Sequence, residues 1–349
     1  MAKKGEKTAD RKKEHIEYCL TDDVSFKSKT TGFESYEFEH FAITEVDIDK
    51  INFRTEFLRK KIDYPFLISC MTGGTSKAGN INAKLSIAAN DLNIPLGVGS
   101  QRQALENDKY LDTYKIIRKN APNIPILGNL GAPQLVKIKP VDKVQALVDM
   151  IEADAMVIHL NPLQELFQEN GQPNFVGLLH RLEMLVKKIN VPVIVKEVGS
   201  GISRKAAQKL IDAGVAGIDV AGAGGTSWAG VEMLRTSNDK YPEFWDWGIP
   251  TAYCLRQIAQ IREYRNFYLI GSGGINSGMD VAKAFALGAD LVASARIILQ
   301  TLDKSDVEGV RDLVIHWFDV VRKVMFLTGS FNLTELKNKN NLIYKDELY

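Results

Sequence analysis

The chain has few cysteines, almost no net charge and no long hydrophobic run. Its 349 residues include three cysteines, which lie far apart and lack the spacing of a zinc site or a disulfide framework. Lys and Arg total 44 against 43 Asp and Glu, so no overall charge favours nucleic acid or an anionic membrane surface. No apolar stretch approaches the roughly 20 residues of a membrane span. These absences predict a cytoplasmic protein that binds neither nucleic acid nor membrane.

What the chain does contain is eight short apolar segments, which end in glycine or polar residues and alternate with helical patterns. The segments begin near residues 65, 94, 124, 155, 191, 217, 267 and 291. Helical spacing covers roughly 77–92, 109–119, 141–151, 175–189, 203–213, 251–264, 277–287 and 306–326. This alternation of apolar strands and helices is typical of an α/β fold, a parallel TIM (β/α)8 barrel. An open doubly wound sheet is the alternative, although its dinucleotide fingerprint after the first strand is missing.

We therefore predict a single barrel domain over 1–349, with an N-terminal arm over about 1–60 and a short C-terminal tail. The last two strands end in small residues that favour a phosphate site. Gly273 and Gly274 follow one strand, and Ser294 with Ala295 follows the next. Glycines allow close approach of a ligand, and a helix N-terminus attracts an anion. The alternative is that the glycines serve only to turn the chain.

Polar side chains recur at the predicted C-terminal ends of other strands, where a barrel places its active site. Arg102, His159, Asn161 and Gln164 offer donors suited to phosphate oxygens. Glu165 is an acid among these donors, as expected if Mg²⁺ bridges to a phosphate. A surface carboxylate on a helix turn is the alternative for Glu165.

Three further features remain open from the residues alone. Lys196 ends an apolar strand, and we expect it to reach the barrel mouth, because an unpaired buried ammonium is costly; a salt bridge to Glu197 is the alternative. Arg11, Lys12 and His15 lie close on one surface of a helix predicted over 8–20 and could bind an anion together, although a solvated basic arm is the usual fate of such a run. The segment 226–250 is predicted to be a long aromatic loop, serving as a lid or a subunit contact.

The spaced motifs resemble one family over nearly the whole chain, the type 2 isopentenyl-diphosphate isomerases, which are FMN-dependent β/α barrels. The motifs are Arg11-Lys-Lys-Glu-His15, Met71-Thr-Gly-Gly74, Gly99-Ser-Gln-Arg102, His159-Leu-Asn-Pro-Leu-Gln-Glu165, Val195-Lys-Glu-Val198, Ala223-Gly-Gly-Thr-Ser-Trp228 and Gly271-Ser-Gly-Gly-Ile275. The chain beyond Gly329 matches no motif that we can place.

The resemblance implies a role for each motif residue. FMN would be bound by Met71, Thr72, Gly73, Ser100, Asn129, Lys196, Thr226, Gly274, Ile275, Asn276, Ala295 and Arg296. The prenyl diphosphate substrate would be bound by Arg11, Lys12, Ser100, Gln101, Arg102, His159, Asn161 and Gln164. Glu165 would bind Mg²⁺, and Gln164 and Lys196 would act in catalysis together with flavin N5.

By the same resemblance, the enzyme interconverts isopentenyl and dimethylallyl diphosphate in isoprenoid biosynthesis by a 1,3-allylic proton shift. It uses FMN reduced by NADPH and forms a homotetramer or a homo-octamer. An FMN-dependent dehydrogenase or oxidase is the alternative activity, but His316 follows the last strand and is poorly placed to be its base. A flavin-free lyase with Lys196 as a Schiff base is a further alternative.

Overall fold

The computed structural model describes residues 4–21, 23–138, 141–237, 240–338 and 341–345. Eight parallel strands form a closed barrel, in the order β10-β11-β4-β5-β6-β7-β8-β9. Their bounds are β4 Phe66–Ile68, β5 Leu96–Gly97, β6 Ile126–Gly131, β7 Ala155–His159, β8 Val193–Lys196, β9 Gly217–Asp219, β10 Tyr268–Gly271 and β11 Leu291–Ser294. All eight lie in predicted segments, so the predicted barrel is confirmed and the doubly wound sheet is wrong.

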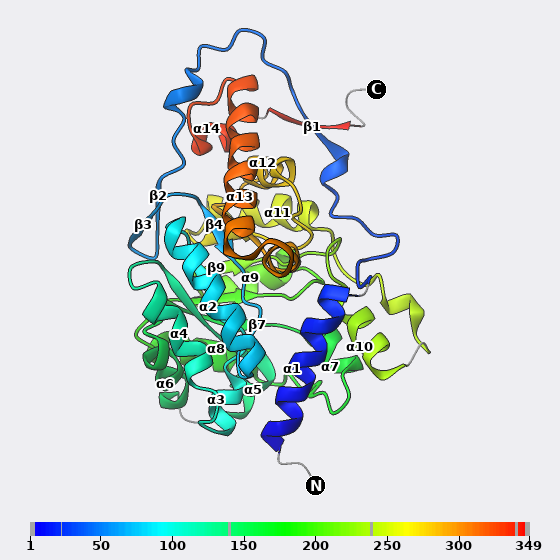
Figure 1. Ribbon diagram of the computed structural model, residues 1–349. Helices are drawn as coiled ribbons and strands as arrows, with labels where there is room; N and C mark the ends of the chain where they lie inside the picture. Colours follow the sequence, from blue (N-terminus) through cyan, green and yellow to red (C-terminus); the bar gives the residue numbers. More distant parts are fainter. Residues whose placement is uncertain (1–3, 22, 139–140, 238–239, 339–340, 346–349) are drawn as a thin grey trace.

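Helices surround the barrel, as Figure 1 shows. The predicted ones are found as α2 Ser76–Asp91, α4 Asp112–Asn120, α6 Asp142–Ile151, α8 Leu178–Lys188, α9 Arg204–Asp212, α11 Thr251–Ala259 and α12 Gly278–Ala286. The last helix, α13 (Arg296–Leu327), begins ten residues earlier than predicted and is broken at Asp306, which has φ 54° and ψ −157°. Its early start places a helix N-terminus directly after β11.

Short helices that the sequence did not suggest follow several strands at the barrel mouth. They are α3 Arg102–Glu106, α5 Ala132–Lys137, α7 Pro162–Phe167 and α10 Trp228–Thr236. The prediction of one long loop over 226–250 is therefore wrong in its first part, which α10 occupies; a role as a lid or subunit contact stays a prediction. The hydroxyl of Ser227 caps this helix by accepting a hydrogen bond from the backbone N–H of Gly230.

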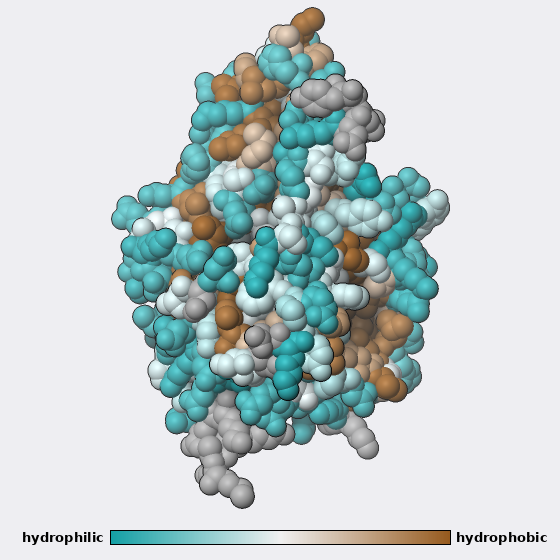
Figure 2. Space-filling view, turned by 90° about the vertical axis from the view of Figure 1, so that its right-hand side faces the viewer, coloured by the Kyte–Doolittle hydropathy of each residue, from teal (hydrophilic) through white to brown (hydrophobic). Residues whose placement is uncertain are grey.

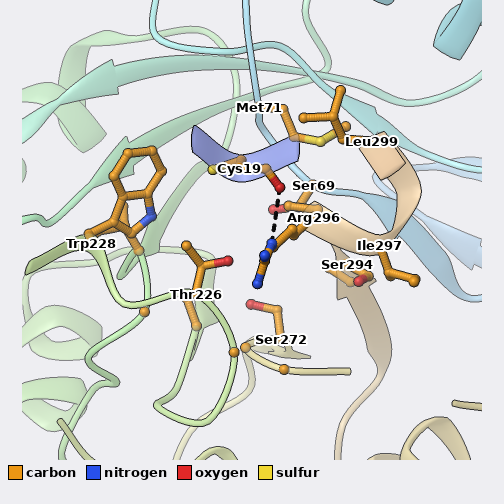
Figure 3. A pocket seen from close by; sticks show the side chains of 18 of the residues that line it. Cys19, Ser69, Met71, Thr226, Trp228, Ser272, Ser294, Arg296, Ile297 and Leu299 are labelled. Atoms are coloured by element: carbon orange, nitrogen blue, oxygen red, sulfur yellow. Dashed lines mark hydrogen bonds between the residues drawn. The ribbon is translucent and has the colours of Figure 1, made fainter. Parts of the chain in front are cut away.

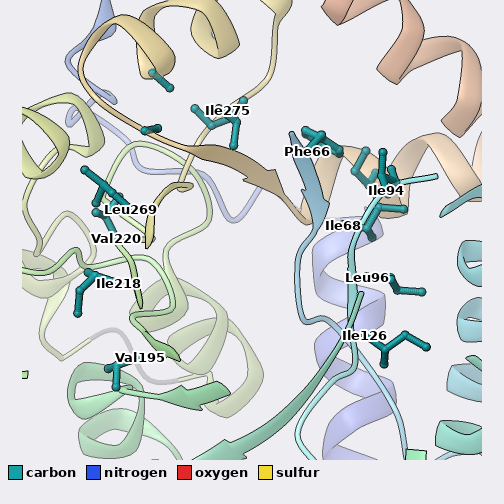
Figure 4. Close-up of a cluster of buried hydrophobic side chains, with 14 of the residues drawn as sticks. Phe66, Ile68, Ile94, Leu96, Ile126, Val195, Ile218, Val220, Leu269 and Ile275 are labelled. Carbon is teal, nitrogen blue, oxygen red and sulfur yellow. The ribbon is translucent and has the colours of Figure 1, made fainter. Parts of the chain in front are cut away.

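Two apolar layers hold the barrel together. Outward-facing strand residues such as Phe66, Ile126 and Val195 pack beneath the helices in the larger cluster (Figure 4). Inward-facing residues, among them Leu67 and Leu127, fill the barrel itself. The alternation of the two sets along each strand explains why the segments read as apolar throughout.

The N-terminal end of the barrel is closed by a hairpin, β2 (Thr55–Phe57) and β3 (Lys60–Ile62). Phe57 and Ile62 are fully buried and pack with the inward-facing strand residues. Beside the hairpin, the carboxylate of Asp154 accepts hydrogen bonds from Lys60 at 2.9 Å and from Arg118 at 2.8 Å. Phe57 and Ile62 thus fill the barrel interior at its N-terminal end.

The N-terminal arm reaches both ends of the molecule. Helix α1 (Lys4–Thr21) lies beside α10 and α3 at the barrel mouth, and the chain then runs to the opposite end (Figure 1). There β1 (Tyr36–Phe38) pairs with β12 (Leu342–Tyr344), which joins the arm to the tail. On the face in Figure 2, hydrophilic side chains are interrupted by apolar areas at the upper tip and lower right. Within the described ranges, no helix is long and apolar enough to cross a membrane.

Candidate active site

The barrel interior changes from apolar to polar near the C-terminal ends of its strands. Because alternate residues of a strand face the same side, the residue two positions after an inward-facing one also faces inward. Val157, Ile194 and Ile270 belong to the apolar filling of the barrel. The next inward positions form a polar layer of Ser69, Asn129, His159, Lys196, Asp219 and Ser272. This polar layer lies at the end where β/α barrels carry their active sites.

A cavity of about 450 Å³ opens above the polar layer, within the range of about 300–1,000 Å³ usual for small-molecule sites. Figure 3 shows Trp228 and Thr226 on one side of it, with Met71 and Leu299 across from them. Of the residues predicted to bind FMN, eight line this cavity: Met71, Thr72, Lys196, Thr226, Gly274, Asn276, Ala295 and Arg296. The predicted cofactor residues thus converge from strands that are far apart in the sequence.

Two adjacent features of the cavity suit a phosphate. Gly273 and Gly274 have φ of 100° and 70°, and a Cβ on Gly273 would lie 2.2 Å from the carbonyl oxygen of Gly222, so the turn requires glycine. Next to it α13 begins after Ala295, and no side chain caps its first turn. The N–H groups and positive dipole of such a helix start favour an anion.

The side chain of Arg296 points toward the N-terminal arm. Its Nε donates to the carbonyl oxygen of Cys19 at 3.1 Å (Figure 3), and its Nη1 donates to the hydroxyl of Ser25 at 2.8 Å. The C-terminal end of α1 is therefore fastened to the helix start that suits a phosphate.

Lys196 reaches the cavity, as its position at the end of a strand suggested. Its Nζ donates to the backbone oxygen of Glu197 at 2.5 Å. The Glu197 carboxylate instead accepts hydrogen bonds from the backbone N–H groups of Val198, Gly199 and Ser200. The alternative of a Lys196–Glu197 salt bridge is therefore wrong, and the ammonium remains part of the cavity lining.

His159 and Asn129 form a pair within the polar layer. His159 Nδ1 lies 2.7 Å from Asn129 Oδ1, which can only accept, so Nδ1 carries the proton in this arrangement. Burial, with the charges of Lys196 and Lys12, lowers the pKa of His159 to about 3. The imidazole is therefore neutral at physiological pH.

A second group of polar side chains joins α7, α10 and α1 next to the cavity. The Gln164 amide is held from two sides, since its Oε1 accepts from Asn161 at 3.1 Å and its Nε2 donates to Glu232 at 3.2 Å. The same Glu232 oxygen lies 2.9 Å from Nε2 of His15 on α1. Burial alone would raise the pKa of Glu232, but His15, Gln164 and Arg235 outweigh it, so the pKa is lowered. Glu232 is thus an ionised carboxylate that fixes the Gln164 amide.

Glu165 lies inside this group, since its side chain is buried. One of its oxygens accepts from Asn161 at 3.1 Å and the other from the backbone N–H of Gln172 at 2.6 Å. The alternative of a surface carboxylate is therefore wrong.

Arg11 and Arg102 lie close enough for their charges to interact, and the Nε of Arg102 also pairs with the Glu106 carboxylate at 3.1 Å. Burial and the neighbouring charge of Arg102 lower the pKa of Arg11, with Glu232 and Glu165 acting in the opposite direction. Two guanidiniums whose charges interact at a partly buried place favour the binding of a polyanion. Helix α1 also contributes Lys12, His15, Ile16 and Cys19 to the cavity lining, so the N-terminal arm is part of the site; the binding of substrate by Arg11 stays a prediction.

Two predicted substrate ligands have partners within the protein. Lys12 Nζ donates to the carbonyl oxygens of Gly73 and Ser100 and to the hydroxyl of Tyr114, at 2.6 to 3.0 Å. The Gln101 amide donates to Leu147 O at 2.8 Å and accepts from the N–H of Asn129 at 2.9 Å. These contacts give Lys12 the role of anchoring α1 and favour a structural role for Gln101; their binding of substrate stays a prediction.

Four predicted cofactor residues do not line the cavity: Gly73, Ser100, Asn129 and Ile275. Ile275 is buried in the outer apolar cluster. The sequence reasoning also missed two acids, Asp219 and Glu232. The available signal was an acid among apolar residues, at the end of a strand for Asp219 and within Val231-Glu-Met233 for Glu232.

The residues present fit the two ligands that the motifs imply. The cavity combines a glycine turn, an uncapped helix start and a lysine, as FMN requires. In the second group, Asn161 Oδ1 is buried without a hydrogen-bond partner, as expected where a ligand belongs. In the part of the chain that the structure describes, no three His, Cys, Asp or Glu side chains gather to hold a metal. A Mg²⁺ ion beside Glu165 would therefore need further oxygen ligands, such as those of a bound substrate or water.

Comparisons with known proteins agree with this site. The FMN-dependent dehydrogenase family matches residues 141–343. An isopentenyl-diphosphate delta-isomerase of Pelodictyon phaeoclathratiforme is 45% identical over 347 residues, covering 95% of this chain and 96% of its own. Enzymes of the same name from a Nostoc species and from Vibrio parahaemolyticus are 45% and 46% identical, covering 96% and 95% of this chain and 96% and 98% of theirs.

Solved structures with the same fold are more distant in sequence. A flavocytochrome b2 with sulfite bound has a TM-score of 0.71 at 20% identity, covering 95% of this chain and 83% of its own. A mandelate oxidase variant has a TM-score of 0.64 at 17% identity, covering 98% and 99%. These likenesses concern the fold alone. By sequence over nearly its whole length, the chain belongs to the isopentenyl-diphosphate delta-isomerase family, within the FMN-dependent β/α barrels.

Proposed function

We propose that this protein interconverts isopentenyl diphosphate and dimethylallyl diphosphate with FMN bound in the cavity above the polar layer. One observation carries the proposal. Arg11 lies within the electrostatic reach of Arg102 and of Glu232, which fixes the Gln164 amide, and the helix that carries Arg11 also lines the cavity that suits FMN. A diphosphate held by the arginines would place its short alkene toward the cavity.

The reaction adds a proton at one carbon and removes another two carbons away. When bound in its reduced form, FMN supplies an electron-rich ring and a proton at N5. Lys196 brings a positive charge to the cavity floor, where it would stabilise negative charge on the ring. Asn161 and Glu232 hold the Gln164 amide in one orientation, so that its polar atoms can exchange a proton with the substrate.

The charged ends of the site bind and orient the substrate. Arg11 and Arg102 would neutralise the diphosphate, and their binding energy would position the reacting carbons. Trp228 and Met71 give the cavity an apolar wall, which suits a prenyl group and excludes water from it. His159, being neutral, would contribute hydrogen bonding but no charge.

We further propose that Glu165 binds Mg²⁺ together with the diphosphate. Mg²⁺ usually keeps several waters and takes one or two carboxylates plus substrate phosphates, which agrees with a single acid here. Glu165→Gln keeps the shape and removes the charge. We expect a large loss of activity and a higher Mg²⁺ requirement, with FMN affinity unaltered; full activity at low Mg²⁺ would exclude the assignment.

The family resemblance extends the proposal to NADPH as the reductant of FMN, to a homotetramer or homo-octamer and to a cytoplasmic location. A dehydrogenase or oxidase activity is less well supported. His316 is exposed on α13 and does not line the cavity, and His159 is too weak a base for hydride chemistry.

The test is an anaerobic assay of the full-length protein with FMN, dithionite, Mg²⁺ and isopentenyl diphosphate. We expect dimethylallyl diphosphate to appear without net oxidation of the flavin. An assay with 2-hydroxy acids under air is the comparison, and turnover of those acids without isomerisation would contradict the proposal.

A further inference from the structure

Arg235 is a largely buried guanidinium beside the polar side chains that join α7, α10 and α1, and the proposed function gives it no role. It lies on α10, three residues after Glu232, and its side chain is 10% exposed. It does not line the cavity. A charged group that is so little exposed is costly unless it is paired.

Three carboxylates from three segments surround this guanidinium. Its Nη1 donates to Glu232 Oε2 at 3.2 Å, and its Nε lies 2.8 Å from Glu14 Oε2 on α1. Glu169, two residues after α7, has its Oε2 3.9 Å from Nη2. The side chains of Glu14 and Glu169 are 50% and 69% exposed, whereas that of Glu232 is fully buried. Because exposed ion pairs contribute little, the contact with Glu232 matters most.

The two oxygens of Glu232 have different partners. Oε1 accepts a hydrogen bond from Gln164 Nε2 at 3.2 Å and lies 2.9 Å from His15 Nε2. Oε2 accepts from Arg235. Because a carboxylate is a rigid plane, the contact at Oε2 fixes the direction in which Oε1 faces Gln164.

We propose that Arg235 is a positioning residue, which holds one oxygen of Glu232 so that the other stays on the Gln164 amide. Through Glu14, the same guanidinium ties this arrangement to α1, the helix that carries Arg11. The inference rests on the proposed function, because it concerns the orientation of the Gln164 amide toward the substrate.

The test uses Arg235→Gln in the full-length protein, loaded with FMN and assayed anaerobically with dithionite, Mg²⁺ and isopentenyl diphosphate. Loss of a hydrogen bond to a charged group changes an equilibrium or a rate about tenfold. We therefore expect kcat to fall about tenfold, with FMN affinity changed less than about twofold. An unchanged kcat with a lower melting temperature would show a structural role alone and overturn the inference.

Glu14→Gln is the matched control, because it removes the charge of the exposed partner on α1 and leaves the pair between Arg235 and Glu232. It should keep the wild-type kcat to within about twofold. A fall of kcat equal to that of Arg235→Gln would mean that Arg235 acts by anchoring α1, and that result would also overturn the inference.

A double variant covers the case in which Arg235→Gln does not fold. Arg235→Gln with Glu232→Gln leaves no buried carboxylate unpaired at this place, and it is compared with Glu232→Gln alone. If Arg235 acts through Glu232, the two variants should have the same kcat to within about twofold. A further loss of about tenfold in the double variant would contradict the inference. A wild type without isomerase activity would instead contradict the proposed function, and the role of Arg235 with it.

Discussion

The two ends of the barrel are built from the same eight strands and differ in every other respect. At the N-terminal end, Phe57 and Ile62 plug the interior and Asp154 ties the hairpin to the barrel. At the C-terminal end the inward-facing side chains turn polar, and glycine turns and helix starts surround a cavity.

Along several strands, the change from apolar to polar side chains occurs between two successive inward-facing residues. Val157 is followed inward by His159, and Ile194 by Lys196. Because both residues of each step sit on the same rigid strand, the apolar end fixes the position of the polar end. Stability and chemistry are therefore separated along the barrel axis. Variants at the closed end should change the stability, and variants at the open end should change the activity.

Phe57→Ala at the closed end should give the largest effect, and on stability alone. Truncating a fully buried phenylalanine costs about 3–5 kcal/mol of unfolding free energy. Denaturation of the apoprotein measures this loss, and FMN affinity at low temperature should be unchanged. Phe41→Ala, at a phenylalanine that is 52% exposed, is the control and should cost far less. A change of FMN affinity in Phe57→Ala that equals the change in stability would contradict the separation.

Lys196→Met at the open end should lower the activity much more than the stability. Loss of a preorganised electrostatic group lowers kcat by about 10²–10³-fold. The unfolding free energy should change less than in Phe57→Ala, because methionine fills a similar volume. Steady-state kinetics and denaturation of the same preparation measure both. Unaltered kcat would remove Lys196 from the mechanism.

Arg11→Ala and Lys12→Ala test whether α1 belongs to the open end. A hydrogen bond to a charged group contributes about 1.5–3 kcal/mol, so each change should raise KM about tenfold or more. FMN affinity should be unchanged. Lys13→Ala on the same helix is the control, since Lys13 forms only an exposed contact with Asp10. Equal KM values for all three variants would exclude the arm from the site.

His159 should give the smallest effect at neutral pH, where its neutral ring contributes hydrogen bonding but no charge, and its loss should also change the pH dependence of stability. Its folded pKa of about 3 lies below the ordinary value, so the unfolded chain binds the proton more readily. The contribution of the neutral His159 ring to the unfolding free energy is therefore complete above about pH 6.5 and is lost as the pH falls toward 3. Denaturation midpoints at several acidic pH values should fall more steeply for the wild type than for His159→Gln. Parallel curves would contradict a neutral buried His159.

The barrel could be predicted because its strands and helices each have a local pattern of apolar residues. The strand that ends in Lys196 and the turn at Gly273 can each be recognised from a few consecutive residues. The acids were harder to recognise. The role of Glu232 depends on its contact with His15, which is 217 residues away, and no local sequence pattern reveals such a partner.

The direction of side chains was equally hidden. Gln101 and Arg102 are neighbours in one motif, yet Gln101 is fully buried and bonded to Asn129, whereas Arg102 is partly exposed and pairs with Glu106. The motif alone could not tell them apart. The pairing of β1 with β12 joins segments about 300 residues apart, so the role of the tail was also beyond sequence reasoning.

The central claim is that the phosphate of FMN binds at the N-terminus of α13. The most direct test is the affinity for FMN, measured by flavin fluorescence for the wild type, Ala295→Gln and Ala295→Glu. A glutamate there should stabilise the helix N-terminus but repel a phosphate, whereas glutamine has the same size without the charge. The account predicts one FMN per chain for the wild type, and affinity at least about tenfold lower for Ala295→Glu than for Ala295→Gln. Equal affinities for the two variants, or no binding by the wild type, would contradict it.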